Sequence, residues 1–168
     1  MKRILMAALC LPSLALPAFA QQTQTAVADF IGADGKETGR AALTQGKDGV
    51  LIEVEVSGLP PGTWVGFHIH ENGVCDAKGH HESAGGHFNP GKKEHGFLAV
   101  NGPHAGDMPN LYVDKDGTAR AHVYNGHVTL NDDNAIRGKA LMIHARSDDY
   151  RSQPAGDAGE RLACAVVK

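Results

Sequence analysis

Histidines concentrate in one stretch of this chain, residues 66–107, at spacings that suit metal ligation. Seven of the ten histidines in the 168-residue sequence lie there, five of them at such spacings, and Asp107 follows the last of them by three positions. The five are His68, His70, His87, His95 and His104. A sixth candidate, His144, stands far downstream in an apolar run. The chain must therefore fold so that a distant segment reaches this stretch, and we interpret the remaining segments as the scaffold of a metal centre.

The first two of these histidines are separated by one residue, in Gly66-Phe67-His68-Ile69-His70. On a β-strand, residues i and i+2 point to the same face. His68 and His70 would then project together, while Phe67 and Ile69 point into the core. A lone histidine on a strand is more often an ordinary core or surface residue. Two at this spacing, followed by three more and an aspartate, favour ligation.

The ligand types divide between two metals. Imidazole suits both zinc and copper, whereas an added carboxylate favours zinc over cuprous copper. Three histidines with Asp107 would make a closed, tetrahedral zinc site. Four imidazoles without a carboxylate suit a tetragonal copper(II) site with an open axial face. Seven ligands cannot fill two four-ligand sites unless one is shared. A deprotonated imidazole can use both nitrogens, so we expect one histidine to bridge the two ions.

The rest of the chain has the pattern of an all-β protein. Residues 50–56 alternate between apolar Val50, Ile52, Val54 and Val56 on one face and glutamates on the other, which predicts a half-buried antiparallel strand. Turn signals separate about eight such segments, and no segment has a convincing amphipathic-helix pattern. The expected architecture is an antiparallel sandwich or barrel. The predicted strands are 25–31, 39–44, 50–56, 63–70, 110–114, 118–124, 140–145 and 162–167.

Two long stretches, 71–109 and 146–161, interrupt this pattern. Loops of that length without secondary structure are usually functional or disordered. The histidines, the aspartate and one cysteine in the first stretch favour a functional role. We find no repeat, linker or second domain.

Residues 1–20 have the composition of a secretory signal peptide. Lys2 and Arg3 form a basic start, residues 4–16 are almost wholly apolar, and Ala18-Phe19-Ala20 has the small-x-small form of a cleavage site. The apolar run is too short to span a bilayer. We therefore expect export with cleavage near Ala20, and a single mature domain from 21 to 168.

Charge and cysteine content limit what the mature domain can do. Removal of Lys2 and Arg3 leaves 14 basic against 19 acidic residues and no basic block, which disfavours nucleic acids and anionic membranes as partners. Two cysteines remain after cleavage, Cys75 and Cys164, and an even pair in an exported chain predicts one disulfide. Its closed loop of about 90 residues would be worth roughly 4–5 kcal/mol in the chain-entropy model.

Several motifs, in order along nearly the whole mature chain, resemble those of the copper,zinc superoxide dismutases. They include residues 66–70, Gly86-His87-Phe88-Asn89-Pro90, His104-Ala105-Gly106-Asp107 and Gly159-Glu160-Arg161-Leu162-Ala163-Cys164. The segment 102–110 is similar to the exported bacterial branch, which implies a periplasmic location. The resemblance also implies an eight-stranded Greek-key β-barrel with two long functional loops.

The resemblance assigns a role to each candidate. It implies that copper is bound by His68, His70, His87 and His144. It implies that zinc is bound by His87, His95, His104 and Asp107, with His87 as the bridge. Asp148 matches the aspartate that links a histidine on each metal, and Cys75 and Cys164 match the family disulfide.

Arg161 matches the arginine that lies over copper in this family. A permanently charged, planar donor can hold a small anion beside the open metal face. The implied activity is the conversion of superoxide to dioxygen and hydrogen peroxide, with one copper and one zinc ion per subunit, in a monomer or homodimer. Basic residues at the channel rim could steer the anion, and the candidates are Lys92, Lys93, Arg146 and Arg151.

Two features depart from the pattern of the family. Ala155 stands where the eukaryotic branch has a threonine that frames the channel, and His80 and His81 match no family ligand. We expect both of these histidines to be exposed. The main rival to an enzyme is a non-enzymatic periplasmic copper- or zinc-binding module, but the chain keeps every copper ligand and the arginine.

Overall fold

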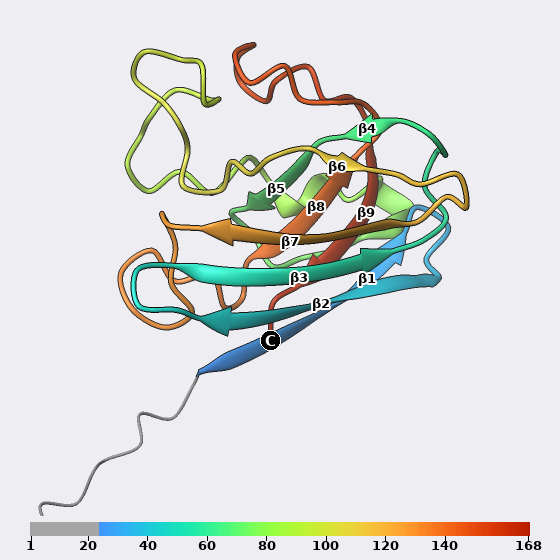
Figure 1. Cartoon of the computed structure of the whole chain (residues 1–168), viewed down its shortest axis with the longest axis horizontal. Helices are drawn as coiled ribbons and strands as arrows, with labels where there is room; N and C mark the ends of the chain where they lie inside the picture. Colours follow the sequence, from blue (N-terminus) through green and yellow to red (C-terminus); the bar gives the residue numbers. More distant parts are fainter. Residues whose placement is uncertain (1–23) are drawn as a thin grey trace, which may run out of the picture.

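The computed structural model describes residues 24–168, which form nine β-strands and two short 3₁₀ turns (Figure 1). The predicted signal peptide, residues 1–20, lies outside the described residues. Among the residues described, no helix is long and apolar enough to cross a membrane. The strands are β1 (Thr25–Gly32), β2 (Glu37–Gln45), β3 (Val50–Val56), β4 (Trp64–Val65), β5 (Phe67–His70), β6 (Leu111–Tyr112), β7 (Ala119–Asn125), β8 (Ala140–His144) and β9 (Arg161–Val166). The 3₁₀ turns are η1 (Ala77–Gly79) and η2 (Glu82–Ala84).

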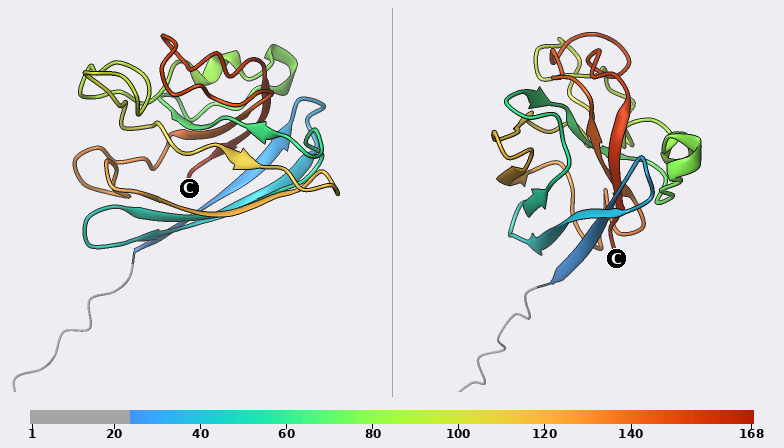
Figure 2. Two further views of the ribbon diagram at one scale, coloured as in Figure 1. Left: turned by 45° about the horizontal axis from the view of Figure 1, so that its top comes forward. Right: turned by 90° about the vertical axis from the view of Figure 1, so that its right-hand side faces the viewer.

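All pairings between the strands are antiparallel, as predicted. Seven strands form one sheet in the order β5-β8-β9-β1-β2-β3-β7, and β4 pairs with β6 in a small second sheet. A bridge between Val113 and Ala119 joins the end of β6 to β7, and β4 runs on into β5. The sheet therefore curls round into a barrel-like half-cylinder that the small sheet helps to close (Figure 2). Because β3 and β4, and then β7 and β8, are consecutive but not neighbours, the connections have a Greek-key character.

The predicted alternation sets the core. Val50, Ile52, Val54 and Val56 are buried inside the barrel, whereas Glu53 and Glu55 face solvent. Phe30 of β1 and Leu43 of β2 reach the same core from neighbouring strands. Burial of these side chains stabilises the fold by roughly 25 cal/mol per Å² of apolar surface.

The predicted single strand 63–70 is wrong, because it divides at Gly66. The Gly66 amide donates to the carbonyl of Arg146, and its carbonyl accepts from the amide of His144. The segment therefore pairs with β6 before Gly66 and with β8 after it, and nine strands result instead of eight. A Cβ at position 66 would also lie 3.0 Å from the side chain of Ala158, so the crossing leaves little room for a side chain.

The two long stretches lie on the same side of the barrel, next to β5 and β8 (Figures 1 and 2). Main-chain hydrogen bonds attach the first of them to the free edge of β5. The Ile69 amide donates to Gly106, the Phe88 amide donates to Ile69, and the Glu71 amide donates to Gly86. This edge pairing brings residues 86–88 and 104–107 beside the strand that carries the first two histidines.

Candidate metal centre

The β5 strand directs its two histidines away from the core, as predicted. Phe67 and Ile69 belong to the hydrophobic core, while His68 and His70 lie on the opposite face and are still almost fully buried. The loops attached to the β5 edge cover that face. Isolated bridges pair His68 with Asp107 and His70 with His87, so the backbone itself sets the spacing between ligand candidates.

Two groups of four buried side chains meet at this face. Within each group, one candidate ligand atom per residue lies within 4.8 Å of the others. The first group is His68, His70, His87 and His144, and the second is His87, His95, His104 and Asp107. His87 belongs to both. These are the seven residues singled out from the sequence.

The second group has the spacing of a tetrahedral site. Asp107 Oδ1 lies 2.9 Å from His87 Nδ1, 3.0 Å from His95 Nδ1 and 3.4 Å from His104 Nδ1. Zinc–nitrogen bonds of about 2.0–2.1 Å place tetrahedral ligand atoms roughly 3.3 Å apart. The remaining oxygen, Oδ2, accepts from the Gly96 and His104 amides. The carboxylate is thus held with one oxygen turned to the three rings.

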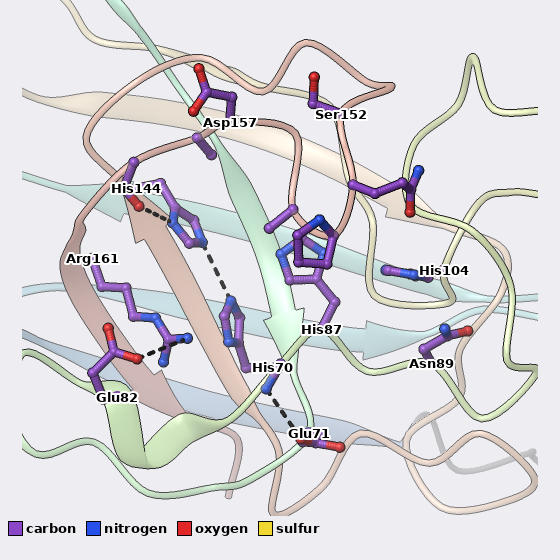
Figure 3. Close-up of a pocket in the computed structure, with 16 residues that line it drawn as sticks. His70, Glu71, Glu82, His87, Asn89, His104, His144, Ser152, Asp157 and Arg161 are labelled. Carbon is purple, nitrogen blue, oxygen red and sulfur yellow. Dashed lines mark hydrogen bonds and ion pairs between the residues drawn. The ribbon is translucent and has the colours of Figure 1, made fainter.

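In the first group, main-chain carbonyls contact the His70 and His144 rings on the side away from the group and fix their orientation. The Nδ1 group of His70 donates to the carbonyl of Gly85 at 2.9 Å, and that of His144 lies 3.3 Å from the carbonyl of Gly159. These bonds leave the two Nε2 atoms facing each other at 3.3 Å. Figure 3 shows the two rings approaching end to end. A hydrogen bond to one ring nitrogen fixes the tautomer and leaves the other nitrogen as a metal ligand.

Three ring nitrogens of these groups are buried and have no hydrogen-bond partner. They are His68 Nδ1, His87 Nε2 and His104 Nδ1. Buried polar atoms are almost always paired, and unpaired ones need an explanation such as an ion. A metal ion in each group would satisfy all three. The donor set therefore fits copper in the all-imidazole group and zinc in the group with the carboxylate.

Asp148 connects the two groups from behind. One carboxylate oxygen lies 2.8 Å from His68 Nε2, and the other lies 3.1 Å from His95 Nε2. Each contact leaves the ring's Nδ1 turned toward its own group. Gly156, which we did not identify from the sequence, makes this approach possible. A Cβ there would lie 1.8 Å from the Asp148 carboxylate, and the residue has a φ of +68°, a region favoured by glycine.

Burial and charge set the protonation states. Burial lowers the pKa of His87 to about 4 and the pKa of His144 to about 3, with nearby histidine charge adding to the shift. Burial also opposes the charge on His95, but hydrogen bonds to Asp107 and Asp148 outweigh it and raise the pKa of His95 to about 9. Burial would raise the pKa of Asp107, yet its close contacts with the rings of His104, His87 and His95 lower that pKa below its ordinary value. At neutral pH, His87 and His144 are therefore neutral and can accept a metal.

Arg161 starts β9 and faces the all-imidazole group. Its side chain is 15% exposed. The guanidinium donates to the carbonyl of His81 at 2.7 Å and to the carbonyl of Gly85 at 2.8 Å. Because Gly85 also accepts from His70, one main-chain oxygen orients both the arginine and a histidine of the first group.

The predicted disulfide is confirmed: Cys75 and Cys164 are bonded, with their Cα atoms 5.6 Å apart.

A pocket of about 860 Å³ opens over the first group (Figure 3). His70, His87, His144 and Arg161 line it, as does Ala155 of the second long loop. Lys92, Lys93, Arg146 and Arg151, the basic candidates from the sequence, are not among its lining residues. Arg146 instead pairs with Asp157 at 2.7 Å.

His81 differs from expectation. It is fully buried, whereas its neighbour His80 is exposed. Both residues have left-handed backbone conformations, with φ of 52° and 58°. The turn they form directs the His81 ring inward and its carbonyl toward Arg161. Polarity alone suggested exposure, and the sequence carried no signal of this turn.

Comparison with known proteins identifies the family. The family model described as copper/zinc superoxide dismutase matches residues 37–167. A Cu-Zn superoxide dismutase 1 of Aquifex aeolicus is 51% identical over 146 residues, covering 84% of this chain and 86% of that protein. Among solved structures, a superoxide dismutase-like protein from Bacillus subtilis has a TM-score of 0.79 at 36% identity, covering 83% of this chain and 95% of that one. The Cu/Zn superoxide dismutase from Brucella abortus has a TM-score of 0.73 at 29% identity, covering 86% and 100%. The chain therefore belongs to the copper,zinc superoxide dismutase family.

Proposed function

We propose that the protein is an exported superoxide dismutase that converts superoxide to dioxygen and hydrogen peroxide. The observation that carries the proposal is His87, whose two ring nitrogens face two different four-residue groups. We propose that copper is held by His68, His70, His87 and His144. We propose that zinc is held by His87, His95, His104 and Asp107.

The chemistry divides between the metals and the chain. When bound, copper would supply the one-electron oxidation and reduction of superoxide. Zinc has a filled d shell and no redox chemistry, so it would have a structural role. Arg161 binds and orients the anion beside the first group, because it lines the pocket with fixed N–H donors. His87 holds or releases a proton at Nε2, the nitrogen with no hydrogen-bond partner. Asp148 acts as a positioning residue, since it fixes the rings of His68 and His95.

A non-enzymatic metal-binding module would need the histidines but not the arginine. Two main-chain carbonyls hold Arg161 in the pocket, and a buffer gains nothing from an anion site of that kind. The arginine therefore favours the enzyme.

The direct test is superoxide dismutation by purified protein loaded with copper and zinc. We expect activity in the wild type and a loss of at least a hundredfold in His144→Ala, because loss of a partner behind a ligand already costs about 10- to 100-fold. His122→Ala is the matched control, since this exposed histidine lies in β7 outside both groups. Activity that survives in His144→Ala would refute the copper assignment. An inactive wild type with both metals bound would favour the metal-binding module.

We further propose that residues 1–20 are removed on export to the periplasm. The basic start, apolar run and Ala18-Phe19-Ala20 support this. Intact-mass measurement of protein from the periplasmic fraction should give a chain that begins near Gln21. A full-length chain retained in the cytoplasm would contradict the proposal, and gel filtration of the mature protein would distinguish monomer from homodimer.

A further inference from the structure

The pocket over the first histidine group is bordered by more acid than base, although the proposed substrate is an anion. Its lining residues include Glu71, Glu82 and Asp157, but only one arginine and no lysine. Figure 3 shows the three acids around the opening, with Glu82 beside Arg161. An acidic border opposes the approach of every anion, so the individual carboxylates need an account.

Two of the three carboxylates are already satisfied. Asp157 forms an ion pair with Arg146 at 2.7 Å. Glu71 accepts from the amide of Gly86 at 3.1 Å, which fixes its carboxylate to the loop backbone. Their charges are thus partly offset or held in place.

Glu82 is different. It begins the η2 turn, and its carboxylate lies 3.6 Å from the Arg161 guanidinium without forming a hydrogen bond to it. The Glu82 side chain is 74% exposed, against 15% for Arg161. The arginine's hydrogen bonds go to the carbonyls of His81 and Gly85. Glu82 therefore places a solvent-exposed negative charge beside the guanidinium, and both side chains line the pocket.

We infer that Glu82 is a specificity-determining residue that makes the anion site at Arg161 selective for small monoanions over dianions. The inference rests on the proposed function and deepens it. Repulsion by one fixed charge is twice as large for a dianion as for a monoanion. A site with both Arg161 and Glu82 keeps most of its attraction for superoxide, while doubly charged anions that compete in the same medium are repelled more strongly.

The size of the effect follows from Coulomb's law. Two unit charges several ångströms apart at a solvated surface interact by roughly RT, which is about a threefold change in affinity. Neutralising Glu82 should therefore raise monoanion affinity about threefold and dianion affinity about ninefold, the square of the first factor. High salt should reduce both factors, because exposed charges are screened.

The test compares Glu82→Gln with wild type, both loaded with copper and zinc. Azide is the monoanion probe, and its affinity is read from the copper absorption spectrum. Sulfate is the dianion probe, and its affinity is read from competition with azide at constant ionic strength. Glu53→Gln is the matched control, since it makes the same charge change on β3, outside the pocket lining.

We expect the azide affinity of Glu82→Gln to rise about threefold and its sulfate affinity by about the square of that factor, with Glu53→Gln unchanged. Equal gains for the two anions would overturn the selectivity, and a variant that matches the control would overturn any role for Glu82. Because azide and sulfate binding do not require turnover, the result stands apart from the outcome of the dismutation assay.

Discussion

At the scale of single residues, the centre depends on which nitrogen of each histidine is left free. His70 and His144 turn Nδ1 to main-chain carbonyls and keep Nε2 for the pocket, whereas His68 turns Nε2 to Asp148 and keeps Nδ1. The ring orientation is thus fixed before any metal arrives. Such preparation removes the need to reorganise buried rings when the ion binds.

His81 shows the cost of a histidine that has no such partner. Its ring is fully buried, and neither nitrogen has a hydrogen-bond partner. Burial lowers the pKa of His81, although Asp76 opposes the shift and Arg161 adds to it. The folded state therefore holds the ring neutral in a pH range where the unfolded chain, with an ordinary histidine pKa of about 6.5, takes up a proton. Stability contributed by this residue is lost as pH falls below that value.

We predict that His81→Phe gains stability relative to wild type as the pH is lowered. The gain between pH 7.5 and pH 5.5 should be about 1 kcal/mol, because phenylalanine removes the proton uptake of the unfolded state. Any strain from the left-handed backbone at this position does not depend on pH and cancels in the comparison. Urea unfolding of the two proteins at both pH values measures the difference in their free energies of unfolding. His80→Asn, an exposed neighbour, is the control, and a pH-independent difference for His81→Phe would contradict the account.

At the scale of elements, the disulfide joins the loop that orients Arg161 to the strand that carries it. Cys75 lies before η1, and Cys164 lies in β9, three residues after Arg161. The carbonyls that hold the guanidinium, those of His81 and Gly85, belong to the same loop. The disulfide therefore ties the strand that carries Arg161 to the loop whose carbonyls hold its guanidinium.

We predict that Cys75→Ser combined with Cys164→Ala lowers the free energy of unfolding by roughly 4–5 kcal/mol. Alanine is chosen at position 164 because that side chain is fully buried, and a new hydroxyl there would lack a partner. Turnover should fall while copper and zinc remain bound, since no ligand is changed. Urea unfolding and metal analysis of the loaded protein test this. An unchanged unfolding midpoint, or a loss of metal equal to the loss of activity, would show that the bond acts differently.

Regular elements could be predicted from the sequence, because periodicity records burial within a strand. The strand 50–56 has the predicted bounds, and all seven ligand candidates meet as expected. The break at Gly66 could not be predicted, because it depends on which distant strand pairs on either side. Gly156, Glu82 and the buried ring of His81 were missed for the same reason: each owes its role to a contact from another loop.

At the scale of the whole molecule, the centre is two unequal sites built at one side of a barrel. Residues 66–107 supply every member of the proposed zinc group but only three of the four histidines in the proposed copper group. The fourth, His144, comes from β8, and Arg161 comes from β9. In the sheet, β8 lies next to β5, and β9 lies next to β8. The barrel thus brings the C-terminal third of the chain to a site that begins in its middle.

The shared histidine is the central claim, and anomalous X-ray diffraction tests it most directly. Crystals of the oxidised protein loaded with copper and zinc would be measured at the absorption edges of both metals. The account predicts two separate ions, with His87 Nε2 bonded to copper and His87 Nδ1 bonded to zinc. Two ions of which only one contacts His87, or a single ion held by all the histidines, would contradict it.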